Sequence, residues 1–423
     1  MSRFTAALAL SCLLGCGSFA CGSSSSRAFD GPPAAQGDGD GGPAAAPTPG
    51  AFTPDGGAAP GNAVIGHLKG TVRAPNGTIP IAGALLYLSK DKPAPTSAKV
   101  YCDTCVHLAA GQLHALSDAT GAYDLPVTTA GKQYLVIQKG GFRAVREITT
   151  TAGDVTINDP STQLPSRSQP ELGDEVPRMT VVHGAYDDIE TSLQKLGIDP
   201  SAIDVVQSAL IGVAAKDFLT DATKVNDRHI VFLPCGDYTQ PAPNTDLSTD
   251  PAIQANLKAF VEAGGRLYVT DWHYDFIART FPGFIDFAGA SQTACSGCGH
   301  TDYDAAASIT DPALASWMNA QSLGSFTLQR NYTGIDGVNA TATTDAMGAP
   351  AMVTPKVWVS GSKASGPAKP ATVSFEQGCG RVLFSTYHTE PSTLALTPQE
   401  RALLGVLLEV NVCTASETGV VVN

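Results

Sequence analysis

The stretch DPAIQANLKAFVEAGGRLYVT, residues 250–270, decides the fold. Its first two residues predict the start of a helix, because Asp250 offers an N-cap carboxylate and the φ of Pro251 is already helical. The glycine pair at 264–265 predicts the end of that helix. Residues 266–270 then form an apolar, strand-like run. A helix that leads directly into a buried strand predicts a layered α/β sheet.

Residues 178–414 repeat this alternation of strands and helices. Further strand-like runs lie at 179–183, 229–233, 356–359, 372–375 and 381–387. Asp-Pro pairs at 199–200 and 311–312 predict helix starts, and the capping box Thr397-Pro398-Gln399-Glu400 predicts the last helix. We therefore predict an α/β layered domain over 178–414, followed by a short tail at 415–423.

Residues 63–160 have a different pattern, with short runs of alternating apolar and polar residues. These runs lie at 67–73, 82–89, 134–139 and 144–149, and turn residues such as Pro75-Asn76-Gly77 separate them. The spacing predicts an all-β sandwich. A polar, proline-containing stretch at 161–177 predicts a linker. The expected fold class is therefore multidomain, an all-β sandwich followed by an α/β domain.

Several segments of the β part resemble a known family. They are Gly70-Thr71-Val72, Ile81-Ala82-Gly83-Ala84, the D-x-x-G-x-Y-x-L-P element from Asp118 to Pro126, and residues 134–141. This pattern resembles the carboxypeptidase regulatory-like, transthyretin-type domain. The resemblance implies an accessory domain that binds or spaces and carries no chemistry of its own.

The α/β part resembles another family through residues 231–236, 260–270 and 387–391. It is similar to the class I glutamine amidotransferase-like fold, which is flavodoxin-like in its layers and includes trehalose-utilisation-type relatives. Residues from 281 to about 355 have no counterpart in that resemblance. The family's triad pairs a cysteine at a strand-to-helix elbow with a His-x-Glu element. His388 and Glu390 match that element, but Asp271 follows the strand where the cysteine is expected, so amide transfer is not expected.

Ligands in a parallel α/β sheet gather beyond the carboxyl ends of the strands. That rule selects one candidate cleft, made of His183, Asp271, His273, His388 and Glu390. Three interpretations stay open for it. The favoured one is an inactive domain with a binding or structural role. A second is a hydrolytic or metal site that adds Asp275 to the cleft. The third makes Cys235 a nucleophile with His388 as its base. We assign no catalytic residue and expect neither a metal nor a cofactor.

The N-terminus resembles a bacterial lipoprotein signal. A short apolar run ends in Leu13-Leu14-Gly15-Cys16, a lipobox, and is too short to span a bilayer. We expect residues 1–15 to be removed and Cys16 to be acylated, with Cys21 as the alternative. Residues 16–62 are rich in glycine, proline, alanine and serine and predict a disordered tether. The expected location is the outer membrane of a Gram-negative bacterium, at its periplasmic face or at the cell surface.

The chain has 10 cysteines, and export predicts that most of them are oxidised. The C-x-x-C spacing predicts the disulfides Cys102–Cys105 and Cys295–Cys298, in preference to a shared zinc site. A helix that runs back over its strand predicts a third disulfide, Cys379–Cys413. Cys235 is then left as a free thiol.

The net charge of −13 excludes nucleic acid as a partner, because the long-range field has the wrong sign. The expected function is therefore that of a lipid-anchored envelope protein with a binding or structural role, with an envelope glycan or protein as ligand. The alternative is an envelope hydrolase that uses a metal or a His388/Glu390 site.

Overall fold

The computed structural model describes residues 63–422 apart from 103–105, 110, 158–159, 185, 208–210, 237–245, 289–301, 364–365, 390–394, 409–413 and 417–420. The predicted signal, the tether and both lipidation candidates, Cys16 and Cys21, lie outside the described residues. So do Cys105, Cys295, Cys298, Glu390 and Cys413. None of the described helices has the length and apolarity needed to cross a membrane.

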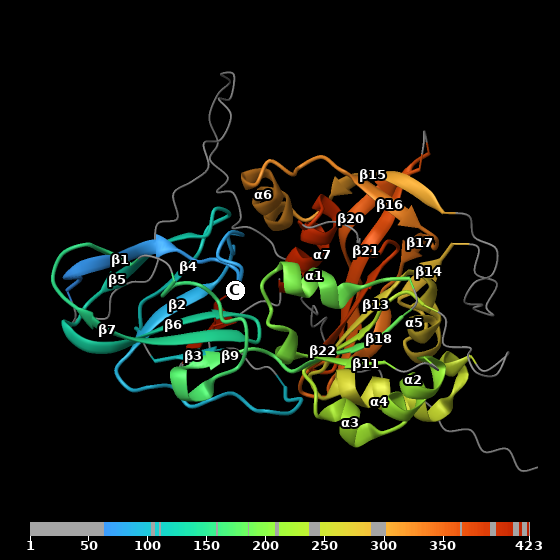
Figure 1. Ribbon diagram of the computed structural model, residues 1–423, viewed down its shortest axis with the longest axis horizontal. Coiled ribbons are helices and arrows are strands. Elements are labelled where there is room, and N and C mark those ends of the chain that lie inside the picture. The colour runs from blue at the N-terminus through green and yellow to red at the C-terminus, as the bar shows by residue number, and fades with distance from the viewer. Residues whose placement is uncertain are drawn as a thin grey trace, which may run out of the picture. The chain divides into compact units, whose positions relative to one another are not determined.

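The β part contains two sheets that pack face to face around an apolar core (Figure 1). The larger sheet has the order β4(His114–Leu116), β2(Leu85–Ser89), β6(Gly131–Lys139), β7(Phe142–Thr150) and β9(Asp174–Glu175). The smaller sheet has the order β5(Ala122–Val127), β1(Gly66–Thr71) and β8(Val155–Thr156). Leu68 and Leu125 of the smaller sheet share one buried cluster with Leu86 and Leu135 of the larger sheet. The predicted β architecture of this part is confirmed at that level.

The segment predicted as a linker contributes a strand to this β part. β9 pairs antiparallel with β7, after the single 3₁₀ turn η1(Pro170–Leu172). Leu164 and Val176, which flank that turn, are buried in the core. The prolines therefore mark turns within the fold.

The α/β part is built on a nine-stranded mixed sheet. Its order is β11(Ile203–Val206), β10(Met179–Val182), β12(Ile230–Leu233), β13(Arg266–Thr270), β22(Gly380–Ser385), β21(Ala368–Gln377), β20(Lys356–Ser362), β15(Tyr303–Ile309) and β16(Thr327–Asn331). The first five strands are parallel, and the others pair antiparallel. The predicted layered sheet is confirmed, and its antiparallel half includes strands from the segment that had no counterpart in the family resemblance.

Helices cover both faces of this sheet (Figure 1). Alternate residues of β12 point to opposite faces of the sheet. Ile230 and Phe232 belong to one buried cluster, and Val231 and Leu233 belong to another. The first cluster includes residues of α1(Ile189–Lys195), α6(Pro312–Ala320) and α7(Pro398–Leu408). The second includes residues of α2(Ile211–Leu219), α3(Ala222–Asn226), α4(Pro251–Glu262) and α5(Tyr274–Thr280).

The predicted aspartate caps form at all three Asp-Pro pairs, and an α-helix follows at two of them. Asp250 accepts a hydrogen bond from the Ala252 amide at 2.9 Å, and Asp311 accepts one from the Leu314 amide at 2.7 Å. The third pair, Asp199-Pro200, starts only the 3₁₀ turn η2(Pro200–Ala202). A full helix cannot follow there because β11 begins at the next residue.

Shorter strands complete the fold. The pair β14(Ile285–Phe287) and β17(Ile335–Val338) and the hairpin of β18(Thr341–Thr344) and β19(Pro350–Val353) lie in the segment between 281 and 355. Near the C-terminus, β23(Thr414–Ser416) pairs with β24(Val421–Val422) and runs parallel to β3(Val106–Leu108) of the β part. The strand at 414–416 therefore adds to the β part.

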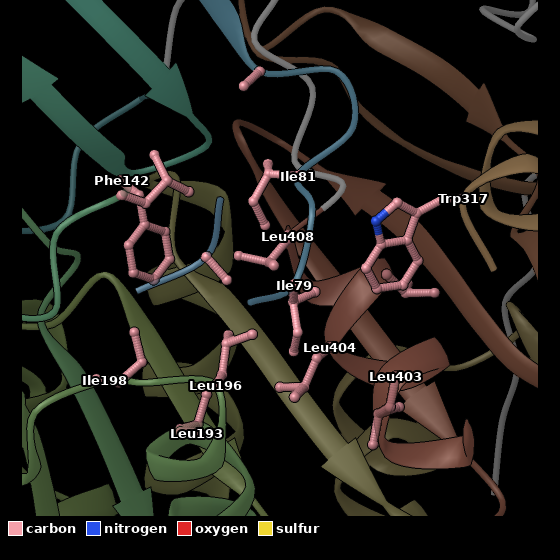
Figure 2. Packing of buried hydrophobic residues seen from close by; sticks show 14 of the residues in the cluster. Ile79, Ile81, Phe142, Leu193, Leu196, Ile198, Trp317, Leu403, Leu404 and Leu408 are labelled. Carbon is pink, nitrogen blue, oxygen red and sulfur yellow. The ribbon is translucent and has the colours of Figure 1, made fainter. Parts of the chain in front are cut away.

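The two parts also pack against each other through apolar side chains (Figure 2). Ile79 and Ile81 of the β part lie beside Leu404 and Leu408 of α7, and all four belong to one buried cluster. Trp317 of α6 closes this contact, since its indole Nε1 donates a hydrogen bond to the carbonyl of Pro80 at 2.7 Å. Within residues 51–423, which form one compact unit, the two parts thus share a core.

A disulfide joins Cys102 to Cys379, with a Cα–Cα distance of 5.1 Å. The predicted pairings Cys102–Cys105 and Cys379–Cys413 are therefore wrong. The reason is that the chain leaves the β part before Cys102 and crosses to the α/β part, where the Val100 amide donates to the Asn226 carbonyl at 3.1 Å. Cys379 stands at the turn between β21 and β22, and its amide donates to the carbonyl of Glu262 at the end of α4. The two cysteines thus meet although 277 positions separate them.

Candidate functional site

Asp271 occupies a strained elbow at the carboxyl end of β13. It has a φ of +46°, a left-handed value that non-glycine residues adopt only occasionally. It also begins η4(Asp271–His273), which leads directly into α5. The backbone therefore forms the strand-to-helix elbow that the family resemblance implies, with an aspartate in place of the cysteine. Strain of this kind concentrates at functional sites.

The Asp271 carboxylate is fully buried and is held by the loop after β16. Its Oδ1 accepts hydrogen bonds from the Thr333 amide at 2.8 Å and from the Thr333 hydroxyl at 2.5 Å. Its Oδ2 accepts one from the Tyr332 amide at 3.1 Å. Burial raises the pKa of Asp271 to about 8, and the hydrogen bonds from Thr333 and Tyr332 act in the opposite direction.

His388 faces Asp271 from the segment after β22. Its Nε2 lies 3.8 Å from Asp271 Oδ2, which is too far for a hydrogen bond. The imidazole is only 5% exposed and stacks on the Tyr332 ring, with 5.9 Å between centroids and 19° between planes. Among the described residues, Nε2 has no hydrogen-bond partner. The sequence rule therefore brings two of its five cleft residues together.

Cys235 completes this centre from the end of β12. It is the free thiol among the described cysteines, as predicted, and it is buried. Its thiol, the Asp271 carboxylate and the His388 imidazole each offer a ligand atom, and these three atoms lie within 4.8 Å of one another. Burial, together with the negative charge of Asp271, raises the pKa of the Cys235 thiol well above its ordinary value. A protonated thiol is a poor nucleophile, so the geometry gives no support to Cys235 as an activated nucleophile.

A second buried carboxylate, Asp187, organises the base of the centre. Its Oδ2 accepts a hydrogen bond from the Thr270 hydroxyl at 2.7 Å, and its Oδ1 accepts one from the Thr389 amide at 3.0 Å. The Thr270 hydroxyl in turn accepts from the Cys235 amide at 2.7 Å. Burial raises the pKa of Asp187, and the nearby His388 acts in the opposite direction.

Asp187 was not among the predicted site residues, although the sequence carries a signal for it. Asp187 follows the end of β10 by five positions, and the carboxyl-edge rule stopped at His183 in that segment. Extending the rule through the following loop would have included it.

Three other residues of the predicted site lie elsewhere, and Glu390 lies outside the described residues. His183 pairs through Nδ1 with Glu190 at 3.0 Å and, with Asp188, belongs to a separate group of possible ligands. His273 is buried beside the Phe276 ring, with 5.6 Å between centroids. Asp275 is buried in α5. None of these three belongs to the centre formed by Cys235, Asp271 and His388.

Three aromatic residues form a row next to this centre, which we call the aromatic row: Tyr186, Trp272 and Tyr332. The Tyr186 and Trp272 rings meet edge to face at 5.3 Å, and the Trp272 and Tyr332 rings meet similarly at 5.4 Å. Tyr186 is 51% exposed, and the other two are half-buried. The aromatic row is therefore partly exposed to solvent, whereas Cys235, Asp271 and His388 are buried.

Comparisons with known proteins give distant likenesses only. No family model matches the sequence, and no curated protein matches it. A ThuA-like protein from Bacteroides uniformis is 9% identical, with 55% of this chain and 91% of that chain covered and a TM-score of 0.32. A cytoplasmic protein from Salmonella typhimurium is 11% identical, with 55% and 98% covered and a TM-score of 0.33.

A third similar structure is the family GH42 β-galactosidase Gan42B, which is 12% identical and has a TM-score of 0.28. The likeness covers 56% of this chain but only 30% of the β-galactosidase. At these scores, the three likenesses assign neither a family nor an activity.

Proposed function

We propose that this chain is a cell-envelope protein that binds a glycan at the carboxyl edge of its large sheet. The observation that carries the proposal is the aromatic row. The C–H face of a sugar ring is apolar and weakly positive, so it stacks on the electron-rich face of tryptophan or tyrosine. Tyr186, Trp272 and Tyr332 lie in the segments that follow three different strands, which gives the row a fixed geometry on a rigid sheet.

The ionisable groups next to the row favour binding over chemistry. The carboxylate of Asp271 already accepts three hydrogen bonds, and burial raises the pKa of the Cys235 thiol, which disfavours the nucleophilic thiolate. Two features favour the hydrolase alternative. They are the elbow conformation of Asp271 and the position of His388, whose Nε2 lies 3.8 Å from Asp271 Oδ2. A carboxylate that is fully buried and hydrogen-bonded in this way is better suited to holding a loop than to attacking a substrate.

The proposed location at the outer membrane is consistent with glycan binding. A lipid on Cys16, or on Cys21, followed by the tether at 16–62, would hold the folded part at the outer membrane of a Gram-negative bacterium. The net charge of −13 disfavours anionic partners and leaves neutral polysaccharides as suitable ligands.

Isothermal titration of residues 51–423 with chitooligosaccharides, which are neutral, tests the proposal. We expect binding that Trp272→Ala and Tyr186→Ala each weaken about tenfold, which corresponds to about 1.4 kcal/mol. The matched control is Tyr134→Ala, which removes a half-buried tyrosine of β6 and should leave binding unchanged.

Two outcomes would overturn the proposal. One is that no saccharide binds, or that the control weakens binding as much as the row variants do. The other is that the bound saccharides are shortened during the titration, which would replace the binding role with the hydrolase alternative.

A further inference from the structure

We infer that Cys235, Asp271 and His388 form a binding site for a divalent transition-metal ion, with zinc as the best match. The three residues stand at the ends of the neighbouring parallel strands β12, β13 and β22. Their ligand atoms lie within 4.8 Å of one another, and Asp271 Oδ2 is 3.8 Å from His388 Nε2. Two ligands about 2 Å from a tetrahedral zinc are separated by roughly 3.5 Å, so small movements would complete the site.

The His388 imidazole gives an independent indication of a missing partner. The His388 side chain is only 5% exposed, and its Nε2 has no hydrogen-bond partner among the described residues. A buried nitrogen without a hydrogen-bond partner is unfavourable, because it has lost its contact with water. Nε2 is directed at the Asp271 carboxylate but remains beyond hydrogen-bond distance, which leaves room for an ion between the two groups.

The charge of the centre also favours a cation. Cys235 and Asp271 are both buried, and a metal ion binds the deprotonated forms of such ligands. A divalent ion would neutralise one thiolate and one carboxylate. The surrounding hydrogen bonds suit this role, because Thr333 and Tyr332 already fix the orientation of the Asp271 carboxylate.

The chemistry of the donor set selects the ion. Sulfur, imidazole nitrogen and carboxylate oxygen are the ligands of zinc, whereas calcium and magnesium require oxygen ligands. Three protein ligands also leave a fourth position for water or a ligand atom. The inference departs from the expectation that no metal binds, and it stands independently of glycan binding by the aromatic row.

The test is a metal titration of residues 51–423 after removal of metal with a chelator. We expect one Zn²⁺ per chain by elemental analysis, and Cys235→Ser and His388→Ala should each weaken Zn²⁺ binding by about 100-fold or more. The matched control is His183→Ala, since His183 lies among carboxylates of the separate group and should leave binding unchanged. Circular dichroism establishes that each variant remains folded.

Cobalt substitution of the wild-type chain decides the question if a variant fails to fold. Co²⁺ bound to a thiolate produces sulfur-to-cobalt charge-transfer absorption, and we expect this band in the wild-type chain but not in Cys235→Ser. Absence of stoichiometric metal in the wild-type chain, absence of the charge-transfer band, or equal loss of binding in His183→Ala would each overturn the inference.

Discussion

His229 has a single tautomer imposed by its neighbours. Its Nδ1 accepts a hydrogen bond from the Arg178 amide at 2.8 Å, so the ring proton is on Nε2. That nitrogen lies 3.0 Å from the Ser97 carbonyl and 3.1 Å from the Lys99 carbonyl, and donates to them. The neutral imidazole thus ties the crossing segment before Cys102 to the α/β part.

Acidification is expected to weaken this tie. Burial lowers the pKa of His229 below its ordinary value of 6.5, while the bonds to Ser97 and Lys99 act in the opposite direction. The unfolded chain therefore binds this proton more readily, so the stabilisation is complete above pH 6.5 and is lost as the pH falls through the lowered folded pKa. Denaturant unfolding of the wild type and of His229→Gln, from pH 8 to 5, measures this loss of free energy of unfolding.

Glutamine is the matched replacement because it accepts with Oε1 and donates with Nε2 but does not titrate. The wild type should lose more free energy of unfolding than His229→Gln as the pH falls below 6.5. Parallel pH profiles for the two proteins would contradict the assigned tautomer.

The residue that follows β13 differs from the cysteine of the family that the sequence resembles, although the backbone forms an elbow there. Because Asp271 follows β13 where the family that the sequence resembles has a cysteine, amide transfer was not expected. The elbow is nevertheless there, since φ at Asp271 is +46°. Backbone conformation depends on the contacts of the loop carrying Tyr332 and Thr333, and no local pattern predicted that these residues would meet Asp271.

At the scale of elements, Glu400 links two helices of one face. The predicted capping box forms, with the Thr397 amide donating to Glu400 Oε2 at 2.6 Å and the Glu400 amide donating to Thr397 Oγ1 at 3.3 Å. The same carboxylate is fully buried and lies 2.9 Å from Lys195 Nζ, at the end of α1. It therefore caps α7 and also fixes α1 against it.

Replacing Glu400 with alanine should destabilise the fold strongly. The substitution leaves the buried Lys195 ammonium without its carboxylate, and breaking a pair of this kind costs about 3–5 kcal/mol. Urea unfolding measures the loss. The control is Glu376→Ala, because Glu376 is exposed and its pair with Arg381 contributes at most about 1 kcal/mol. Equal losses in the two variants would contradict the role of Glu400.

Elements with strong terminal signals were predictable from the sequence. The helix α4 and the strand β13 form as the Asp-Pro start and the Gly-Gly stop predict. The carboxyl-edge rule also placed Asp271 and His388 in one site. Both predictions depend on local signals or on sheet topology, which tertiary packing did not override in this fold.

At the scale of the whole molecule, Cys102–Cys379 cross-links the β part to the α/β part. No sequence pattern predicted this pairing, because C-x-x-C spacing favours a local partner and the true partner is 277 positions away. Cysteine pairing over such a distance depends on the packing of the two parts, which Ile81, Trp317 and Leu404 create.

Removing this disulfide should lower stability by about 2–5 kcal/mol. Cys102→Ser and Cys379→Ser should each lower the midpoint of thermal unfolding, and peptide mapping under non-reducing conditions should recover the Cys102–Cys379 pair from the wild type. Cys105→Ser is the control and should change neither result. A mapped Cys102–Cys105 pair would contradict the structure.

The same bond has a consequence for biosynthesis. Ribosomes make the chain from its N-terminus, so Cys102 and Cys105 emerge together long before Cys379 is made. Any early bond between the first two must be exchanged before the native one can form. The Cys102–Cys379 bond thus marks a chain that has been synthesised beyond Cys379, and products that end before Cys379 lack it.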